Sequence, residues 1–189
     1  MRIVLLGAPG SGKGTQAAIL RDRLNIPHIS TGELLRAAVK AGTELGLKAK
    51  AVMEAGELVS DEIVLGMLRE RLEQDDARGG FILDGYPRNL AQAEALDGLL
   101  SELNQPVEEA IQIEVDVEAV VQRLAKRALE EGRSDDTEET VRKRMGVYEE
   151  QTAPVVEFYE RQEKLARVYG MGTIDEVSER IIEILSGDA

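Results

Sequence analysis

Residues 1–16 constrain the fold of this chain more than any other segment. Residues 2–6 are apolar and partly β-branched, which is typical of a strand buried on both faces. Four glycines and Lys13 follow between positions 7 and 14, and residues 16–24 then have the composition of a helix. Glycine lets the backbone approach a ligand closely, and the amide groups of the first helical turn point toward an anion. A strand, a glycine-rich turn with a lysine, and a helix in this order predict a loop that binds phosphate groups.

The loop departs at one position from the general pattern G-x-x-x-x-G-K-[ST]. Positions 7–13 fit it, but Gly14 stands where a serine or threonine is expected, and the hydroxyl group comes one residue later, at Thr15. We therefore expect the usual hydroxyl ligand of Mg²⁺ to be missing or displaced. A chance glycine-rich turn is the alternative, and the strand before the loop and the helix after it argue against that interpretation.

Length and charge narrow the class of protein. A chain of 189 residues suits one domain with small insertions, and a net charge of −13 disfavours binding of nucleic acid or an anionic membrane through bulk charge. The absence of cysteine excludes disulfides, thiolate metal sites and a cysteine nucleophile. No apolar run approaches the roughly 20 residues of a membrane span, and no signal peptide precedes the first strand. We expect a cytoplasmic protein without nucleic-acid or membrane partners.

Five short apolar runs alternate with helical segments along the chain. They predict strands at residues 2–6, 27–29, 81–83, 110–115 and 165–169. This alternation predicts an α/β fold in which a five-stranded parallel sheet has helices on both faces. Ligands bind such sheets beyond the carboxyl ends of the strands. In this chain those ends hold the glycine-rich loop, Ser30, residues 84–88 and Asp116.

Capping residues predict where several helices begin. Ser30 with Glu33, and Thr173 with Glu176, have the spacing of a capping box. Asp136 is predicted to cap a long helix that Pro154 interrupts. Other helices are predicted near residues 47–55, 60–72, 90–103 and 117–130.

Asp84 follows a buried strand at the edge where the phosphate loop lies. A carboxylate in this place is expected to hold hydrated Mg²⁺. The alternative is a turn-forming Asp-Gly pair with Gly85.

Several arginines lie near strand ends or chain breaks, and guanidinium is suited to bidentate phosphate contacts. A solvated surface position is the alternative for each one alone, so the prediction depends on the whole set. Arg142 and Arg144 are two residues apart and face different sides of a helix, so at most one should point into a given site. The candidates are Arg36, Arg88, Arg123, Arg127, Arg133 and Arg144.

The sequence has no obvious general base. We find no His/Asp pair and no serine beside a base, and we interpret His28, the only histidine, as structural. A hydroxyl acceptor would need such a base, whereas a phosphate monoester is already mostly dianionic at neutral pH. The residues therefore favour an enzyme that holds two polyanions together and neutralises their charge with a lysine, magnesium and arginines.

Six motifs in order closely resemble those of the adenylate kinases, within the nucleoside monophosphate kinase family. They are GAPGSGKGTQ at 7–16, HISTGELLR at 28–36, GELVSDEIV at 56–64, GFILDGYPR at 80–88 followed by Gln92, GRSDD at 132–136 and RKRM at 142–145. The G-K-G-T ending that breaks the general rule is this family's own variant. The resemblance implies a P-loop NTPase fold with a core at 1–29, 60–122 and 137–189. It also implies a helical AMP-binding insertion at 30–59 and a short lid at 123–136.

The resemblance also implies roles for individual residues. Its ATP site consists of Gly10, Ser11, Gly12, Lys13, Gly14, Thr15, Arg123, Arg127 and Gly172. Arg123 would lie over the adenine, Arg127 would contact the phosphates, and the backbone at Gly172 would touch the adenine. Its AMP site consists of Thr31, Arg36, Glu57, Leu58, Val59, Gly85, Tyr86, Pro87, Arg88 and Gln92, with Arg133 and Arg144.

The implied reaction is transfer of the terminal phosphoryl group of ATP to AMP, giving two ADP. Arg88 would hold the AMP phosphate, Gln92 would read the adenine edge, and Arg133 and Arg144 would bridge the transferred group. The catalytic set is then Lys13, Asp84, Arg88, Arg123, Arg133 and Arg144, with Mg²⁺ near Asp84. Only residues 128–132 separate Arg127 from Arg133, so this is a short lid without structural zinc, and we expect a monomer.

Two other functions stay open at this point. A UMP/CMP kinase would look similar, but such enzymes tend to have alanine where this chain has Thr31, so Thr31 favours AMP. A nucleotide-binding regulator would use the loop as a switch, but it would leave the arginines on the acceptor side without a role.

Overall fold

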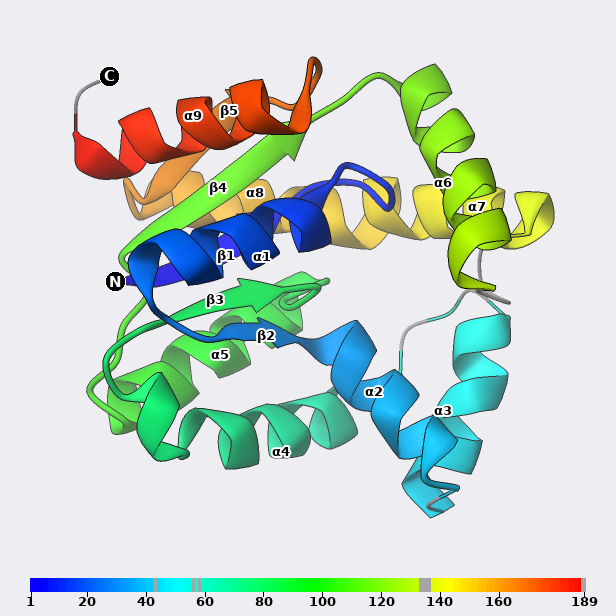
Figure 1. Ribbon diagram of the computed structural model, residues 1–189. Helices are drawn as coiled ribbons and strands as arrows, with labels where there is room; N and C mark the ends of the chain where they lie inside the picture. The colour runs from blue at the N-terminus through cyan, green and yellow to red at the C-terminus, as the bar shows by residue number, and fades with distance from the viewer. Residues whose placement is uncertain (43, 56, 58, 133–136, 188–189) are drawn as a thin grey trace.

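The computed structural model describes residues 1–42, 44–55, 57, 59–132 and 137–187. Within these residues, five strands form one parallel sheet in the order β2-β3-β1-β4-β5 (Figure 1). They are β1 (Arg2–Leu6), β2 (His28–Ser30), β3 (Phe81–Asp84), β4 (Glu109–Glu114) and β5 (Leu165–Tyr169). Each lies within one residue of its predicted position, so the predicted parallel sheet is confirmed.

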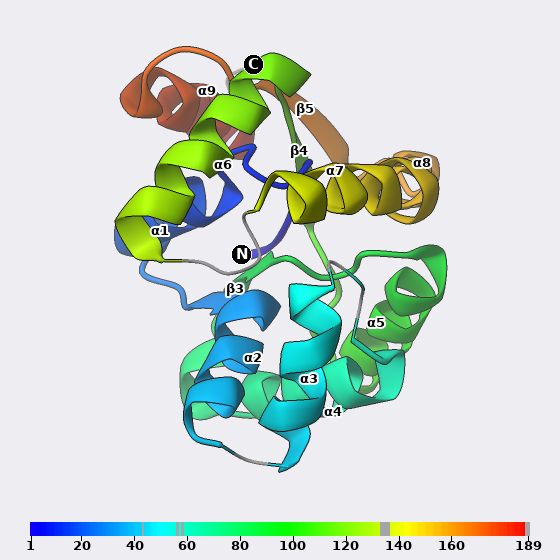
Figure 2. The same cartoon turned by 90° about the vertical axis from the view of Figure 1, so that its right-hand side faces the viewer.

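Alternate residues of the central strand β1 build the core on both faces of the sheet. Ile3 and Leu5 belong to the cluster formed with α1 (Lys13–Leu24) and α9 (Ile174–Ser186). Val4 and Leu6 belong to the cluster formed with α4 (Asp61–Leu72), α5 (Leu90–Glu102) and α8 (Ala153–Arg161). Figure 2 shows α1 and α9 on one side of the sheet and α5 and α8 on the other. A strand covered on both faces can be apolar throughout, which explains the continuous hydrophobic run.

The order of the strands places the phosphate loop at the centre of one edge. The chain passes from β1 outward to β2 and β3 on one side, and later to β4 and β5 on the other. The loop after β1 therefore lies where the direction of winding changes, which is where α/β sheets bind ligands.

Two helical pairs stand at this edge (Figure 1). Below it lie α2 (Thr31–Lys40) and α3 (Glu44–Glu54), and above it lie α6 (Val117–Glu131) and α7 (Glu138–Val147). The pairs meet where Thr140 Oγ1 donates a hydrogen bond to the Glu54 carbonyl at 3.4 Å and Lys143 forms an ion pair with Glu57 at 2.9 Å.

Several helices begin elsewhere than predicted. α1 begins at Lys13, before the predicted residue 16, because Gly12 has a φ of 97° and serves as the N-cap. α3 begins at Glu44 and includes Gly46, where a side chain would collide with the Ala38 carbonyl of α2. Glycine at this position therefore permits close packing of two helices.

The predicted helix cap at Asp136 was wrong. The N-cap of α7 is Thr137, whose Oγ1 accepts a hydrogen bond from the Thr140 amide at 3.3 Å. Asp136 itself lies outside the described residues. The predicted interruption near Pro154 is confirmed, since a π-helical turn, η3 (Tyr148–Thr152), separates α7 from α8. The remaining element in the described part of the chain is a short 3₁₀ helix, η1 (Asp75–Ala77).

Candidate active site

The phosphate loop wraps around the side chain of Lys13. Its Nζ donates hydrogen bonds to the carbonyls of Gly7 at 2.8 Å and Ala8 at 3.1 Å, and lies 3.5 Å from Ser11 Oγ. These carbonyls hold the ammonium group at the start of α1, beside the free amides of its first turn.

The surroundings of Lys13 disfavour the positive charge of its ammonium group. Burial lowers the pKa of Lys13 to about 8, the charge of Asp84 opposes this, and Arg88, Arg144 and Arg127 lower it further. Four cationic side chains therefore converge near one point, which an incoming polyanion would neutralise.

Asp84 pairs with His28 at the carboxyl end of the sheet. The ring Nε2 of His28 lies 3.2 Å from Asp84 Oδ2, and both side chains are almost fully buried. Burial by itself would raise the pKa of Asp84, but the His28 hydrogen bond and the charge of Lys13 outweigh it and hold that pKa below its usual value. Asp84 is therefore an ionised carboxylate, and His28 Nε2 donates to it.

The expectation that the chain has no His/Asp pair was wrong. His28 is paired in register with Ile82, and Asp84 follows two residues later on the same face of the sheet. Strand pairing brings together two residues that are 56 positions apart. His28 is not among the residues that line the cleft described below, whereas Asp84 is, so only the carboxylate of this pair reaches the cleft.

The residues at this edge fit a hydrated magnesium ion. The Asp84 carboxylate faces the phosphate loop, since a Cβ on Gly14 would lie 3.6 Å from Asp84 Oδ2. One ionised carboxylate beside a phosphate site is the usual donor set for Mg²⁺, which keeps most of its waters. Among the described residues, no group of three or more His, Asp or Glu side chains is arranged to hold a metal ion.

The segment after β3 is closely tied to α2. Thr31 Oγ1 donates to the Gly85 carbonyl at 3.0 Å, and Arg88 Nε donates to the same carbonyl at 2.8 Å. Gly85 has a φ of 82°, and a Cβ there would lie 3.1 Å from Thr31 Oγ1 and 3.2 Å from the Arg88 guanidinium. Only glycine fits this turn, which places Arg88 beside Thr31.

Gln92 is buried and holds the same segment from the other side. Its Oε1 accepts a hydrogen bond from the Arg88 amide at 2.7 Å, and its Nε2 donates to Asp61 Oδ1 at 2.7 Å. The Asn89 side chain caps α5 by accepting from the Gln92 amide at 2.8 Å. Gln92 thus connects Asp61, at the start of α4, to the backbone of Arg88.

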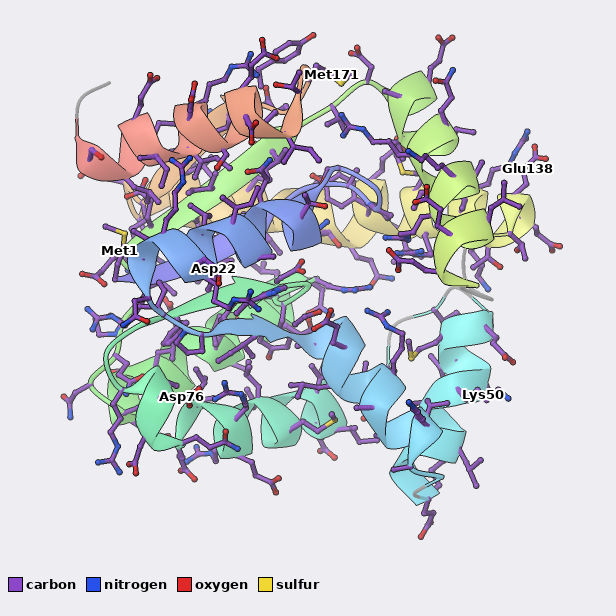
Figure 3. The ribbon with its side chains drawn as sticks, in the orientation of Figure 1. Met1, Asp22, Lys50, Asp76, Glu138 and Met171 are labelled. Carbon is purple, nitrogen blue, oxygen red and sulfur yellow. The ribbon has the colours of Figure 1, made fainter. Side chains whose placement is uncertain are left out.

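Arg123 connects the phosphate loop to the loop after β5. Its guanidinium donates to the carbonyls of Ser11 at 3.3 Å and Gly170 at 3.2 Å. Arg180 holds the same β5–α9 loop by donating to the carbonyls of Tyr169 at 2.8 Å and Met171 at 2.7 Å. Met171 is at the tip of this loop in Figure 3. The segment that contains Gly172 is therefore fixed beside the phosphate loop.

These segments enclose one cleft of about 690 Å³. Every predicted site residue that the structure describes lines it, with the exception of Pro87. On the phosphate-loop side these are Gly10, Ser11, Gly12, Lys13, Gly14, Thr15, Arg123, Arg127 and Gly172. On the opposite side and between the two are Thr31, Arg36, Glu57, Val59, Asp84, Gly85, Tyr86, Arg88, Gln92 and Arg144.

One predicted residue that the structure describes does not line the cleft. This residue is Pro87, which lines a smaller cavity behind the phosphate loop. Leu58 and Arg133 lie outside the described residues. Arg142 is exposed and pairs with Glu138 at the outer end of α7 (Figure 3), so Arg144 alone of that pair reaches the cleft, as the two-residue spacing predicted.

Sequence reasoning also missed residues of the cleft. Gln16 lines it and donates to the Ile174 carbonyl at 3.0 Å, and its place in the first motif could have indicated a role. The others reach the cleft only through packing and had no signal in the sequence. They include Lys126, Thr173, Ile174 and Val177.

The charge of the cleft is opposite to that of the protein. Among the described lining residues, seven are basic and five are acidic, whereas the whole chain has 23 basic and 36 acidic residues. A local excess of guanidinium and ammonium groups in an acidic protein favours polyanionic ligands.

Comparisons with known proteins show which family the chain resembles. A family model described as adenylate kinase matches residues 5–164. Adenylate kinase of Xanthomonas campestris pv. campestris (strain 8004) is 63% identical over 185 residues, which are 98% of this chain and 99% of that protein. Adenylate kinase of Stenotrophomonas maltophilia (strain K279a) is 60% identical over 182 residues, 96% of this chain and 97% of its own length. No helix in the described part of the chain has the length and apolar character needed to cross a membrane.

Proposed function

The chain belongs to the adenylate kinase family, and we propose that its cleft transfers the terminal phosphoryl group of ATP to AMP in the way set out below. The family, the P-loop NTPase fold and the enzyme class that the motifs predicted are thereby confirmed. The reaction is reversible, gives two ADP and keeps the adenine nucleotides in balance. The observation that carries the residue-level proposal is that both predicted subsites line one cleft, where the charges of Asp84 and Arg144 act on Lys13.

ATP binds on the phosphate-loop side in this proposal. The amides of residues 10–15 and the ammonium group of Lys13 contact its phosphates, and Arg127 adds a second cation. Arg123 and the backbone at Gly172 flank the adenine. The contacts of Arg123 with both Ser11 and Gly170 support this, because they place one guanidinium between the phosphate loop and the β5–α9 loop.

AMP binds on the opposite side. Arg88 and Arg36 hold its phosphate, and Thr31 and Gln92 lie on the adenine side, with residues 57–59 and 85–87 shaping the pocket. The bonds of Thr31 and Arg88 to the one carbonyl of Gly85 support a rigid acceptor pocket. Leu58 and Arg133 belong to this proposal on the resemblance of their motifs alone.

The chemistry requires charge neutralisation more than proton transfer. Lys13, Arg88, Arg133 and Arg144 stabilise the negative charge that spreads over the transferred group. Asp84 would hold Mg²⁺ through water, and bound Mg²⁺ supplies further positive charge at the phosphates. The AMP phosphate needs no base, because it is largely dianionic at neutral pH.

Closure of the lid and of the AMP-binding insertion would exclude water, which otherwise competes as the acceptor. We assign residues 30–59 to an AMP-binding insertion, residues 123–136 to a short lid, and residues 1–29, 60–122 and 137–189 to the core. The hydrogen bond of α7 to Glu54 and its ion pair with Glu57 support an insertion that meets the far side of the cleft. We further propose a cytoplasmic monomer without nucleic-acid or membrane partners, consistent with the net charge of −13.

The test is ADP formation from ATP and Mg²⁺ by the purified protein, with AMP, CMP or UMP as acceptor. Rapid formation of two ADP per AMP, with little ADP from CMP or UMP, is the expected result. A preference for CMP or UMP would keep the fold and mechanism and overturn the roles of Thr31 and Gln92. Slow ADP formation at a rate that does not depend on which monophosphate is added would instead favour a nucleotide-binding regulator. Arg88→Ala should lower kcat/KM for AMP at least ~100-fold.

A further inference from the structure

The peptide groups on both sides of Arg88 are held by other segments of the chain. The Arg88 amide donates to Gln92 Oε1 at 2.7 Å, and its carbonyl accepts a hydrogen bond from Thr152 Oγ1 at 2.6 Å. Its side-chain Nε donates to the Gly85 carbonyl at 2.8 Å. Gln92 and Gly85 are neighbours of Arg88 in sequence, whereas Thr152 is 64 residues away.

Thr152 is the last residue of the π-helical turn η3. This turn lies between α7, which carries Arg144, and α8, which packs on the sheet. A regular α-helix advances by about 100° per residue, so Thr152, eight residues after Arg144, would point about 80° away from it. A π turn accommodates one extra residue. The separation then corresponds to seven residues, and the two side chains fall within about 20° of one direction.

The cavity behind the phosphate loop is consistent with this geometry. Arg144, Thr152 and Arg88 all line it, together with Lys13, and its volume is about 60 Å³. Because of the π turn, Arg144 reaches the cleft while the Thr152 hydroxyl group, on the same continuous helical segment, reaches the backbone of Arg88.

We propose that Thr152 is a positioning residue for the acceptor, which acts by fixing the Arg88 carbonyl and hence the direction of its guanidinium. This proposal rests on the role of Arg88 as the ligand of the AMP phosphate. Thr152 is not among the residues that line the cleft, so it should act through Arg88, and its effect should fall on AMP rather than on ATP. The hydroxyl group is the part that acts, because it donates the only bond that η3 makes to this carbonyl among the hydrogen bonds described.

The experiment compares Thr152→Val, which keeps the shape and removes the donor, with Thr152→Ser, which keeps the donor. AMP affinity is measured by titration calorimetry without ATP, and KM for AMP and for ATP by steady-state kinetics. Loss of one hydrogen bond of about 1 kcal/mol corresponds to about fivefold weaker AMP binding. We expect at least this loss in Thr152→Val, an unchanged KM for ATP, and recovery in Thr152→Ser.

Two further variants separate a specific effect through Arg88 from a general effect of removing a hydroxyl group. Ser186→Ala removes a hydroxyl group that bonds the Ile182 carbonyl far from the cleft, and it should change neither constant. In Arg88→Ala, the additional change Thr152→Val should cause no further loss of AMP affinity, because both act through one side chain. Thr152→Ala serves in the same assays if the valine variant does not fold.

The contrary results are equally specific. Unchanged AMP affinity in Thr152→Val, or equal losses for AMP and ATP, would overturn the positioning role, provided that Arg88→Ala does lose AMP. Normal AMP binding by Arg88→Ala would instead overturn the proposed acceptor site itself.

Discussion

Replacing Lys13 with methionine should strongly reduce activity and at the same time stabilise the protein at neutral pH. The lysine is held among carbonyls with Arg88, Arg127 and Arg144 nearby, and burial lowers its pKa from 10.5 to about 8. A charge that the folded state disfavours reduces stability until a polyanion binds. Its removal should lower kcat/KM by at least ~100-fold, since it contacts the phosphates in our proposal.

The size of the effect on stability follows from the two pKa values. A fall from 10.5 to about 8 makes the charged lysine cost about 3 kcal/mol at pH 7. Methionine also loses the bonds to the Gly7 and Ala8 carbonyls, at about 1 kcal/mol each. The variant should therefore be more stable than the wild type by about 1 kcal/mol at this pH.

The dependence on pH has a definite sign. Between about pH 8 and about pH 10.5 the unfolded chain holds more protons on Lys13 than the folded protein, so the wild type gains stability as the pH rises. Methionine does not titrate. The advantage of the variant should therefore shrink by about 2 kcal/mol between pH 7 and about pH 9.5, and reverse there.

Urea unfolding followed by far-ultraviolet circular dichroism, without nucleotide, measures both values. Lys48→Met, at a lysine that is 68% exposed, is the control for removal of one positive charge. A Lys13→Met variant that is less stable than the wild type at pH 7, with a difference that does not change with pH, would refute the reasoning.

Four further predictions follow from the same contacts. The kcat/KM for ATP should fall above about pH 8 as free Lys13 loses its proton, while kcat stays level because bound phosphate retains that proton; parallel falls in the two pH profiles would contradict this. Asp84→Asn should raise the Mg²⁺ concentration for half-maximal activity at least ~10-fold, and an unchanged Mg²⁺ titration would remove Asp84 from the metal site. Gly85→Ala, at a φ of 82°, should cost about 1–2 kcal/mol in urea unfolding and raise the KM for AMP, and a neutral effect would mean that the turn adapts. Thr173→Ala breaks a capping box and should lower Tm by about 3 °C, whereas an unchanged melting curve would show that the cap adds nothing.

Much of the site could be predicted because its signals are local. The phosphate loop is one continuous segment, and the strand ends follow apolar runs of a few residues. Parallel strands must place their carboxyl ends together, so Asp84 and Arg88 were expected near Lys13, and they line the same cleft. The capping box of Thr173 and Glu176 spans four residues, and it is present as predicted.

The first residues of helices were less predictable where neighbouring residues could each start the helix. Asp136 and Thr137 are both good N-caps, and the hydrogen bond to the Thr140 amide decides for Thr137. Gly46 resembles a loop residue, but close approach of the Ala38 carbonyl requires a glycine inside α3. Such choices depend on where neighbouring segments lie.

The sequence by itself determined the phosphate loop, the parallel sheet and the set of cationic residues, because these follow from periodicity and short motifs. Only the tertiary structure decided which distant groups meet. The pairing of His28 with Asp84 depends on the register of two strands, and the contact of Thr152 with Arg88 depends on one extra residue in a π turn. Both join residues more than 50 positions apart, and a shift of one residue in either segment would turn the side chain to another face.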